Sequence, residues 1–327
     1  MQQPVFDTSN LWNINADNFL TTCQHLYQFQ ANYNPVYKQW IALSKQQNTF
    51  IEGVNQIPFL PIAFFKSHGV YIGEQPTTLF ESSGTTQDIV SKHWVADTNL
   101  YERSFINCFE LFYGNPVEYC IIGLLPSYLQ RKHSSLVYMV DKLIRLSGNA
   151  HSGFYLNDFE DLNKVLQLLE SQQQKTILIG VSFALIDFVD LFPQQLKYTT
   201  IMETGGMKGR KTEMLKSELH NYLIKGFGVD QIHAEYGMTE LLSQAYSTGN
   251  GLFRCPPWMR ILIGDPEDPT VLKTSGRGVI HVIDLANVYS CAFIATEDIG
   301  YLYEDGSFEI LGRMDNSDRR GCSLLVI

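Results

Sequence analysis

From about residue 76, short apolar runs alternate with amphipathic segments, and this alternation limits the folds open to the chain. Residues 119–125 and 176–180 each have the length and apolar content of a buried strand. Residues 158–171 repeat apolar side chains at helical spacing. Strands that alternate with helices build a largely parallel sheet covered by helices. We therefore predict an α/β fold for residues 76–250.

The regions on either side have a different character. Residues 1–75 keep apolar side chains at helical spacing from Ala16 onward until Pro58 and Pro61 interrupt the pattern, which predicts a helical N-terminal segment. Residues 251–327 contain short strands punctuated by glycine, which predicts a smaller β-rich subdomain with a C-terminal tail. The strands expected there are residues 260–264, 278–283 and 307–311.

Composition excludes several classes of protein. The chain has 327 residues, of which 45% are hydrophobic, enough to bury a large core. Its formal net charge of −10 argues against binding to a nucleic-acid backbone. No segment has the pattern of a signal peptide or a membrane span, so we expect a cytoplasmic protein. A small molecule or another protein is the expected partner.

The cysteines and one serine raise further possibilities. Six cysteines occur without C-x-x-C spacing, so neither a zinc site nor a disulfide framework is indicated.

Residues 180–184 (Gly-Val-Ser-Phe-Ala) resemble the nucleophile elbow of an α/β hydrolase, with Ser182 as nucleophile, although the last glycine of that motif is missing. The simpler interpretation of Ser182 is an N-cap on the following helix.

Four polar segments, 82–86, 236–240, 296–300 and 312–315, carry the strongest functional signal. Hydroxyls around Gly84 can surround phosphate oxygens, although an ordinary Ser/Thr turn has the same composition. Tyr236 offers a flat face to a purine, and Glu240 is an oxygen ligand suited to Mg²⁺. Asp298 can accept hydrogen bonds from ribose hydroxyls. Together these segments indicate a site for ATP and Mg²⁺.

In this order the segments resemble the adenylate-forming superfamily, which includes acyl-CoA synthetases, adenylation domains of peptide synthetases, and luciferases. The resemblance covers residues 80–322 and implies the fold of that superfamily's large domain. It also implies that a carboxylate attacks the α-phosphorus of ATP, and that Thr239 and Glu240 are catalytic, with Glu240 binding Mg²⁺. The ATP-binding residues that it implies are Ser82, Ser83, Gly84, Thr85, Thr86, Gly205, Gly206, Tyr236, Gly237, Thr239, Asp298 and Arg313.

The sequence departs from the superfamily pattern in two places. Members of the superfamily continue into a mobile C-terminal domain with a catalytic lysine, whereas no lysine follows Lys273 here, so we expect that domain to be lacking. The phosphate loop also lacks its usual Gly-x-Pro-Lys ending. Neutralisation of charge during adenylation is then expected from Lys92, Arg319 or Arg320.

A branch that tolerates this truncation is the LuxE-like acyl-protein synthetase family. The resemblance implies that a fatty acid is activated, passed to a cysteine near the C-terminus, and then handed to a reductase partner. Cys322 has that position, and the adjacent Arg319 and Arg320 favour its thiolate form. The alternative for Cys322 is a small buried residue in a terminal strand. His133 has a position near the carboxylate in relatives, although a solvated histidine at a helix start fits equally.

Three functions remain open from the sequence. In the first, the protein activates a fatty or other carboxylic acid with ATP and Mg²⁺, transfers it to Cys322, and passes it to an acyl-accepting protein. In the second, a related ligase transfers the acyl group to coenzyme A or to a carrier-protein thiol. In the third, an idle adenylation fold serves as a scaffold for a partner.

Overall fold

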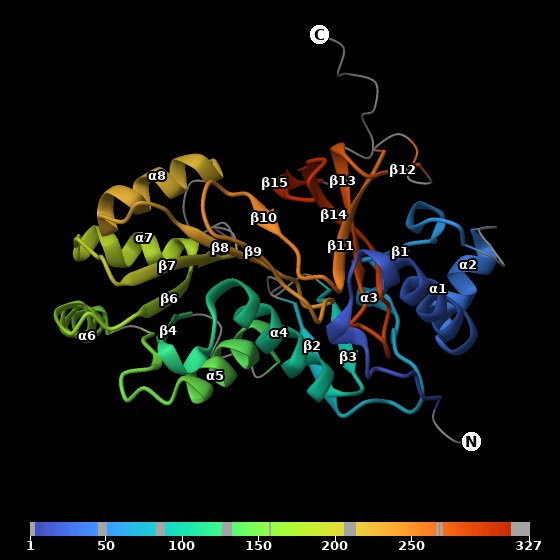
Figure 1. The fold of residues 1–327 in the computed structure, drawn as a ribbon, viewed down its shortest axis with the longest axis horizontal. Helices are drawn as coiled ribbons and strands as arrows, with labels where there is room; N and C mark the ends of the chain where they lie inside the picture. The colour runs from blue at the N-terminus through green and yellow to red at the C-terminus, as the bar shows by residue number, and fades with distance from the viewer. Residues whose placement is uncertain are drawn as a thin grey trace, which may run out of the picture. The chain divides into compact units, whose positions relative to one another are not determined.

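A computed structural model describes residues 4–44, 51–82, 89–125, 133–156, 158–205, 214–265, 268 and 271–314 of the chain (Figure 1). These residues form two compact units, and each is described by itself. Unit 1 consists of residues 1–101, 240–243 and 254–327, and unit 2 consists of residues 102–239 and 244–253. Described residues before 102 and after 253 thus belong to the same unit.

Unit 2 is built on a parallel sheet with the strand order β5-β4-β6-β7-β8, and β9 pairs antiparallel to β8. Every residue of β4 and β6 is buried, as expected for strands covered on both faces. This confirms the predicted parallel sheet and two of its predicted strands. The strands are β4 (Cys120–Leu124), β5 (Gly153–Phe154), β6 (Thr176–Val181), β7 (Thr199–Thr204), β8 (His233–Tyr236) and β9 (Ala245–Ser247).

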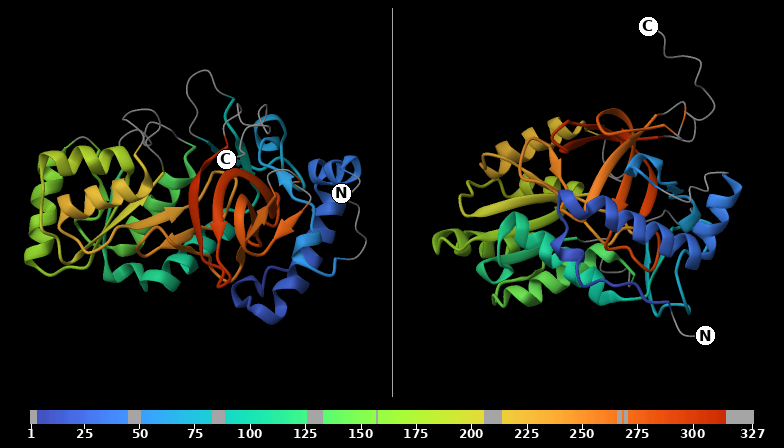
Figure 2. Two further views of the ribbon diagram at one scale, coloured as in Figure 1. Left: turned by 90° about the horizontal axis from the view of Figure 1, so that it is seen from above. Right: turned by 45° about the vertical axis from the view of Figure 1, so that its right-hand side comes forward.

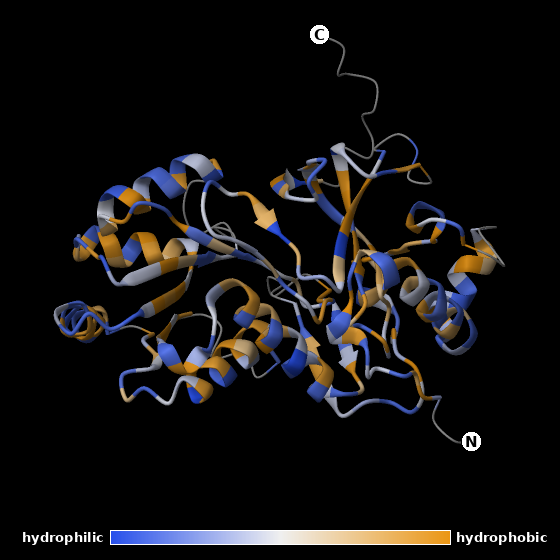
Figure 3. Ribbon diagram, viewed as in Figure 1, coloured by the Kyte–Doolittle hydropathy of each residue, from blue (hydrophilic) through white to orange (hydrophobic). Residues whose placement is uncertain are grey.

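Helices connect the parallel strands of unit 2. Helix α6 (Phe159–Ser171) begins after its N-cap Asp158, as the spacing predicted, and its apolar stripe is buried. Figure 3 shows both polar and apolar residues along this helix. The connections β4–α5–β5 and β6–α7–β7 run in opposite directions along the sheet. Right-handed crossovers then place α5 and α7 on opposite faces. The helices are α4 (Thr98–Tyr113), α5 (Ser135–Ser147), α7 (Ser182–Leu191) and α8 (Lys216–Phe227), with a 3₁₀ turn η3 (Pro116–Glu118).

Unit 1 contains an antiparallel sheet with the order β12-β11-β13-β14-β15, and β1 pairs parallel to β14. The three predicted strands of this region correspond to β11, β13 and β15, and β13 is longer than the sequence indicated, whereas β14 was not predicted. A separate hairpin pairs β2 with β3. The strands are β1 (Leu60–Pro61), β2 (Thr78–Glu81), β3 (Lys92–Val95), β11 (Met259–Gly264), β12 (Leu272–Lys273), β13 (Gly276–Asp284), β14 (Phe293–Leu302) and β15 (Phe308–Arg313), and β10 (Phe253–Arg254) lies at the boundary of the two units.

The N-terminal helices belong to unit 1 and contact the turn between β13 and β14 (residues 285–292). The amide nitrogen of Gln30 donates to the carbonyls of Asn287 and Val288, both at 2.9 Å, and that of Asn34 donates to the carbonyl of Ser290 at 2.7 Å. These buried contacts join the N-terminal helices to the turn between β13 and β14 in one core. The helices are α1 (Ala16–Tyr33), α2 (Pro35–Leu43) and α3 (Phe64–Ser67), with 3₁₀ turns η1 (Leu11–Asn13) and η2 (Val54–Gln56); Figure 2 gives two further views.

Within the described ranges, no helix is long and apolar enough to cross a membrane. None of the five cysteines in the described residues forms a disulfide, and Cys23, Cys108, Cys120 and Cys291 are buried, as is common for cysteine side chains.

Candidate active site

The stem of the expected phosphate loop is formed by β2 and β3. The amide of Ser82 donates to the carbonyl of Ser91 at 3.0 Å, and the amide of Ser91 donates to the hydroxyl of Ser82 at 2.9 Å. These two bonds fix where the loop begins and ends. The loop residues Ser83, Gly84, Thr85 and Thr86 lie outside the described residues.

Glu240 lies next to this stem. Its side chain is only 4% exposed, and the hydroxyl of Ser91 hydrogen-bonds to its carboxylate. Burial raises the pKa of Glu240, although the bond from Ser91 and the charge of Arg313 oppose the shift. A buried carboxylate that is costly to ionise gains from a cation beside it. Ser91, which the sequence reasoning did not select, thus links the loop to the expected metal ligand.

Asp298 and Arg313 occupy paired positions on β14 and β15. Arg313 Nε lies 3.3 Å from Asp298 Oδ1, and the Asp298 side chain is 15% exposed whereas that of Arg313 is 65% exposed. The hydroxyl of Thr296 accepts the Asp298 amide at 3.0 Å and donates to the Ile280 carbonyl at 2.7 Å, which holds the middle of β14 against β13. Asp298 is therefore fixed, while Arg313 reaches solvent.

Unit 1 thus contains residues from all four polar segments. Ser82, Glu240, Asp298 and Arg313 come from positions far apart in the sequence, and Glu240 is electrostatically coupled to both Asp298 and Arg313. A buried carboxylate beside a loop stem, together with a guanidinium, can hold a metal-bound polyphosphate, since hard oxygen ligands bind Mg²⁺ and a guanidinium binds phosphate.

The remaining expected nucleotide-binding residues belong to unit 2. Tyr236 ends β8 and is buried, with its ring 6.0 Å from that of Phe253. Gly205 follows β7 with φ +71°, a conformation that glycine adopts readily. Gly237 and Thr239 follow Tyr236, and the chain passes from unit 2 to unit 1 between Thr239 and Glu240. Gly206 lies outside the described residues.

A buried polar cluster in unit 2 was missed by the sequence reasoning. The hydroxyl of Ser182 lies 2.8 Å from Glu203 Oε1 and 2.6 Å from the Gly205 carbonyl, and Glu203 Oε2 lies 3.4 Å from Lys216 Nζ and 3.7 Å from His220 Nε2. Burial acts to raise the pKa of Glu203, but the charge of Lys216 and the contacts with His220 and Ser182 outweigh it and lower the pKa.

This cluster corrects the interpretation of Ser182. The residue is the first of α7, and its N-cap is Val181, whose side chain makes no capping bond. The N-cap prediction is therefore wrong, because the hydroxyl points to the end of β7 instead of the α7 amides. A hydrolase would need a histidine on the serine, whereas the bonds observed join Ser182 to a carboxylate and a carbonyl. The hydrolase alternative thus gains no support here.

The other predicted residues are not brought to this site by the described contacts. His133 is exposed and precedes Ser134, whose hydroxyl caps α5 by accepting the Val137 amide at 3.3 Å. Lys92 is exposed at the start of β3. Cys322, Arg319 and Arg320 lie outside the described residues.

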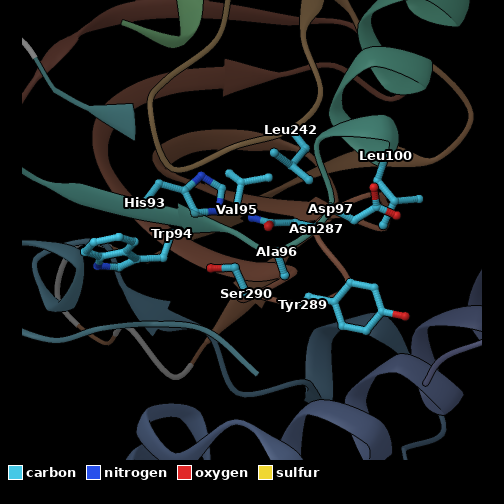
Figure 4. Close-up of a pocket in the computed structure, with 10 residues that line it drawn as sticks. All are labelled: His93, Trp94, Val95, Ala96, Asp97, Leu100, Leu242, Asn287, Tyr289 and Ser290. Carbon is cyan, nitrogen blue, oxygen red and sulfur yellow. The ribbon is translucent and has the colours of Figure 1, made fainter. Parts of the chain in front are cut away.

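Figure 4 shows a small cavity in unit 1, lined by β3, the start of α4, Leu242 and the turn at residues 287–290. Its volume of about 10 Å³ has room for a single water molecule, so it cannot be the binding pocket of an acid or a nucleotide. Over the part of the chain that is described, no group of three or more His, Cys, Asp or Glu residues could hold a metal ion on its own.

Comparison with solved structures identifies the fold. A 2-hydroxyisobutyryl-CoA ligase in complex with 2-HIB-AMP and CoA matches 96% of this chain and 75% of its own, with a TM-score of 0.67 and 10% identity. ATP-bound MatB from Rhodopseudomonas palustris matches 72% of this chain and 47% of its own, with a TM-score of 0.55 and 18% identity. This chain therefore spans about half the length of MatB. The fold is that of the large domain of adenylate-forming enzymes, as predicted.

Comparison of sequences is more specific. A long-chain-fatty-acid–luciferin-component ligase from Aliivibrio fischeri is 23% identical over 330 residues, which cover 91% of this chain and 85% of that ligase. The model of the family described as acyl-protein synthetase, LuxE, matches residues 141–327, more than half of the chain. The chain therefore belongs to the LuxE family of acyl-protein synthetases.

Proposed function

We propose that this protein activates a carboxylic acid, with a long-chain fatty acid as the first candidate, by forming an acyl-adenylate from ATP, and that Cys322 then accepts the acyl group. Family membership supports the ATP-dependent activation of an acid. The name of the Aliivibrio fischeri relative supports a long-chain fatty acid as the substrate.

The observation that carries the proposal is the convergence of Ser91, Glu240, Asp298 and Arg313 in unit 1. These residues are far apart in the sequence, and the nucleotide chemistry expected of Glu240, Asp298 and Arg313 requires those three to be neighbours. An ordinary Ser/Thr turn at residues 82–86 would give no reason for a buried glutamate beside its stem.

The residues present fit Mg²⁺. Glu240 is a buried carboxylate that accepts a hydrogen bond from a hydroxyl, and Mg²⁺ is commonly held by one or two carboxylates together with substrate phosphates. Bound Mg²⁺ supplies positive charge to the phosphates. Glu240 would hold it, and Ser91 keeps the Glu240 carboxylate oriented by its hydrogen bond.

In the proposed first step, an oxygen of the substrate carboxylate forms a bond to the α-phosphorus of ATP, and the bond from that phosphorus to the bridging oxygen breaks, releasing pyrophosphate. Asp298 is assigned to the ribose hydroxyls as an acceptor. Arg313 is assigned to the negative charge that gathers on the phosphate oxygens, where its guanidinium acts without a proton transfer.

In the proposed second step, the Cys322 thiolate attacks the acyl carbonyl, the bond from that carbon to the phosphate oxygen breaks, and AMP leaves. The thiol proton passes to solvent. A thioester keeps the acyl group activated for transfer to an acceptor protein. Coenzyme A or a carrier-protein thiol is the alternative acceptor, in which case the product would appear in solution or on a second protein.

The adenylation step is tested by acid-dependent exchange of labelled pyrophosphate into ATP, measured with carboxylic acids of graded chain length. Glu240→Gln and Arg313→Ala are expected to lower the exchange rate by roughly 10²-fold or more, because each removes charge that the transition state needs. Exchange should also require Mg²⁺.

Arg254→Ala is the matched control. Arg254 pairs with Asp305 at 2.8 Å in the same unit, and its exposed ion pair has no role in the proposed reaction. We expect this variant to exchange at the wild-type rate. If the wild type exchanges pyrophosphate and Arg313→Ala and Glu240→Gln do so at the same rate, neither residue takes part in the reaction. If the wild type shows no exchange with any acid, the scaffold function is favoured.

A further inference from the structure

The segment Glu240–Ser243 carries the proposed Mg²⁺ ligand but belongs to no helix or strand. The hydrogen bonds of a helix or a sheet therefore do not hold this segment, although Glu240 must keep one position to serve as a ligand. All four residues are part of unit 1, and Glu240, Leu242 and Ser243 are almost fully buried. The contacts that fix them come from the turn between β13 and β14.

Asp284, the last residue of β13, makes the first set of contacts. Its carboxylate is fully buried and accepts the amides of Leu242 at 2.8 Å and Ser243 at 2.9 Å. It also accepts the hydroxyl of Ser243 at 2.5 Å and the amide of Ala286 at 3.2 Å. A buried carboxylate with this many donors holds them rigidly, because losing any one would leave charge uncompensated.

Asn287 makes the second set. Its side-chain nitrogen donates to the carbonyl of Glu240 at 2.8 Å and to the carbonyl of Cys291 at 2.9 Å. The residue is 1% exposed, and Figure 4 shows it beside Leu242 at the small cavity. Asn287 thus fixes the backbone of Glu240 itself, two residues before the amides that Asp284 binds.

From these contacts we infer that Asp284 and Asn287 are positioning residues, which hold the Glu240 carboxylate in place by binding the backbone on its C-terminal side. The inference rests on the proposed function, because it gives Glu240 the role of Mg²⁺ ligand. Neither residue needs to touch the substrate. They act by fixing the position of the Glu240 carboxylate, as residues that hydrogen-bond to metal ligands without contacting the metal do.

The test uses the full-length chain and measures pyrophosphate exchange as a function of Mg²⁺ concentration. For Asp284→Asn and Asn287→Leu we expect the half-saturating Mg²⁺ concentration to rise roughly tenfold or more. Much of the lost rate should return at high Mg²⁺. A residue that only stabilised the fold would lower the melting temperature and leave the half-saturating concentration unchanged.

Glu170→Gln is the matched control, because Glu170 makes the same kind of contacts in unit 2. Its carboxylate accepts the amides of Lys197 at 2.8 Å and Tyr198 at 3.0 Å and the hydroxyl of Thr199 at 2.7 Å. We expect this variant to lose stability while keeping the wild-type Mg²⁺ dependence.

The outcomes distinguish failure of the positioning role from failure of the proposed function. If the wild type exchanges but Asp284→Asn and Asn287→Leu keep its Mg²⁺ dependence, the inference is wrong and the proposed function stands. Asn287→Leu retains a side chain of similar volume and tests the inference alone if Asp284→Asn does not fold. If the wild type itself shows no exchange with any acid, the proposed function fails, and the positioning role fails with it.

Discussion

At the scale of single residues, two neighbouring strands of unit 2 carry buried glutamates whose pKa values shift in opposite directions. Glu203 on β7 is held near Lys216 and His220, and its pKa is lowered. Burial raises the pKa of Glu235 on β8 to about 7, and the hydroxyl of Thr204 donates to it at 2.6 Å. Environment, and not residue type, decides the charge of each.

Glu235 gives a prediction for stability against pH. Its folded pKa of about 7 lies above its ordinary value of 4.5, so folding stability is lost as the pH rises between these values. Glu235→Gln should remove this loss and stabilise the protein by about 1–3 kcal/mol at pH 8, with little effect at pH 4. Thermal unfolding of both proteins across this range checks it. Parallel stability curves would show that Glu235 ionises normally in the folded protein.

At the scale of elements, α1 supports the turn that holds the proposed metal ligand. Gln30 is fully buried, donates to the Asn287 and Val288 carbonyls, and accepts the Ala292 amide at 3.0 Å. The same turn binds the backbone of residues 240–243. Hydrogen bonds from α1 to the turn, and from the turn to Glu240, therefore connect the N-terminal helix to the candidate site.

Gln30→Ala is expected to destabilise the protein by about 2–4 kcal/mol, because it leaves three backbone groups of the turn without their partner. Urea unfolding measures this change. The control is Gln28→Ala on the same helix, whose side chain is exposed and which should shift stability by less than about 0.5 kcal/mol. Equal effects for the two variants would mean that the turn does not depend on α1.

The elements that the sequence could predict are those with strong periodicity. β4, β6, β11, β13 and α6 were found because burial on one or both faces leaves a regular apolar pattern. The hairpin of β2 and β3 was missed because its strands have only four residues each. The role of Ser182 was misjudged because a long-range contact with Glu203 overrides the local capping preference.

The same distinction holds for the candidate site. Glu240, Asp298 and Arg313 could be selected from local motifs, since their chemistry is visible in the residues around them. Ser91, Asp284 and Asn287 could not, because each acts through a partner far away in the chain. An aspartate at the end of an apolar strand, followed by Asn287 in the turn, was the one available signal for the last two.

At the scale of the whole molecule, the chain leaves unit 1 after residue 101, returns for residues 240–243, and returns again at residue 254. The motif at residues 236–240 therefore contributes to both units, with Tyr236 and Thr239 in one and Glu240 in the other. Asp284 and Asn287 fix the backbone of residues 240–243, the short segment that belongs to unit 1. For the whole chain, we propose that this fold makes an acyl-adenylate and passes the acyl group to Cys322.

The most direct test is intact mass spectrometry of the protein after incubation with ATP, Mg²⁺ and a panel of fatty acids, before and after hydroxylamine. We predict a mass increase of one acyl group on the wild type that hydroxylamine removes and that Cys322→Ala lacks, while Cys255→Ala retains it. A hydroxylamine-labile adduct that persists in Cys322→Ala, or exchange of pyrophosphate with no adduct, would contradict the assignment of Cys322 as the acceptor.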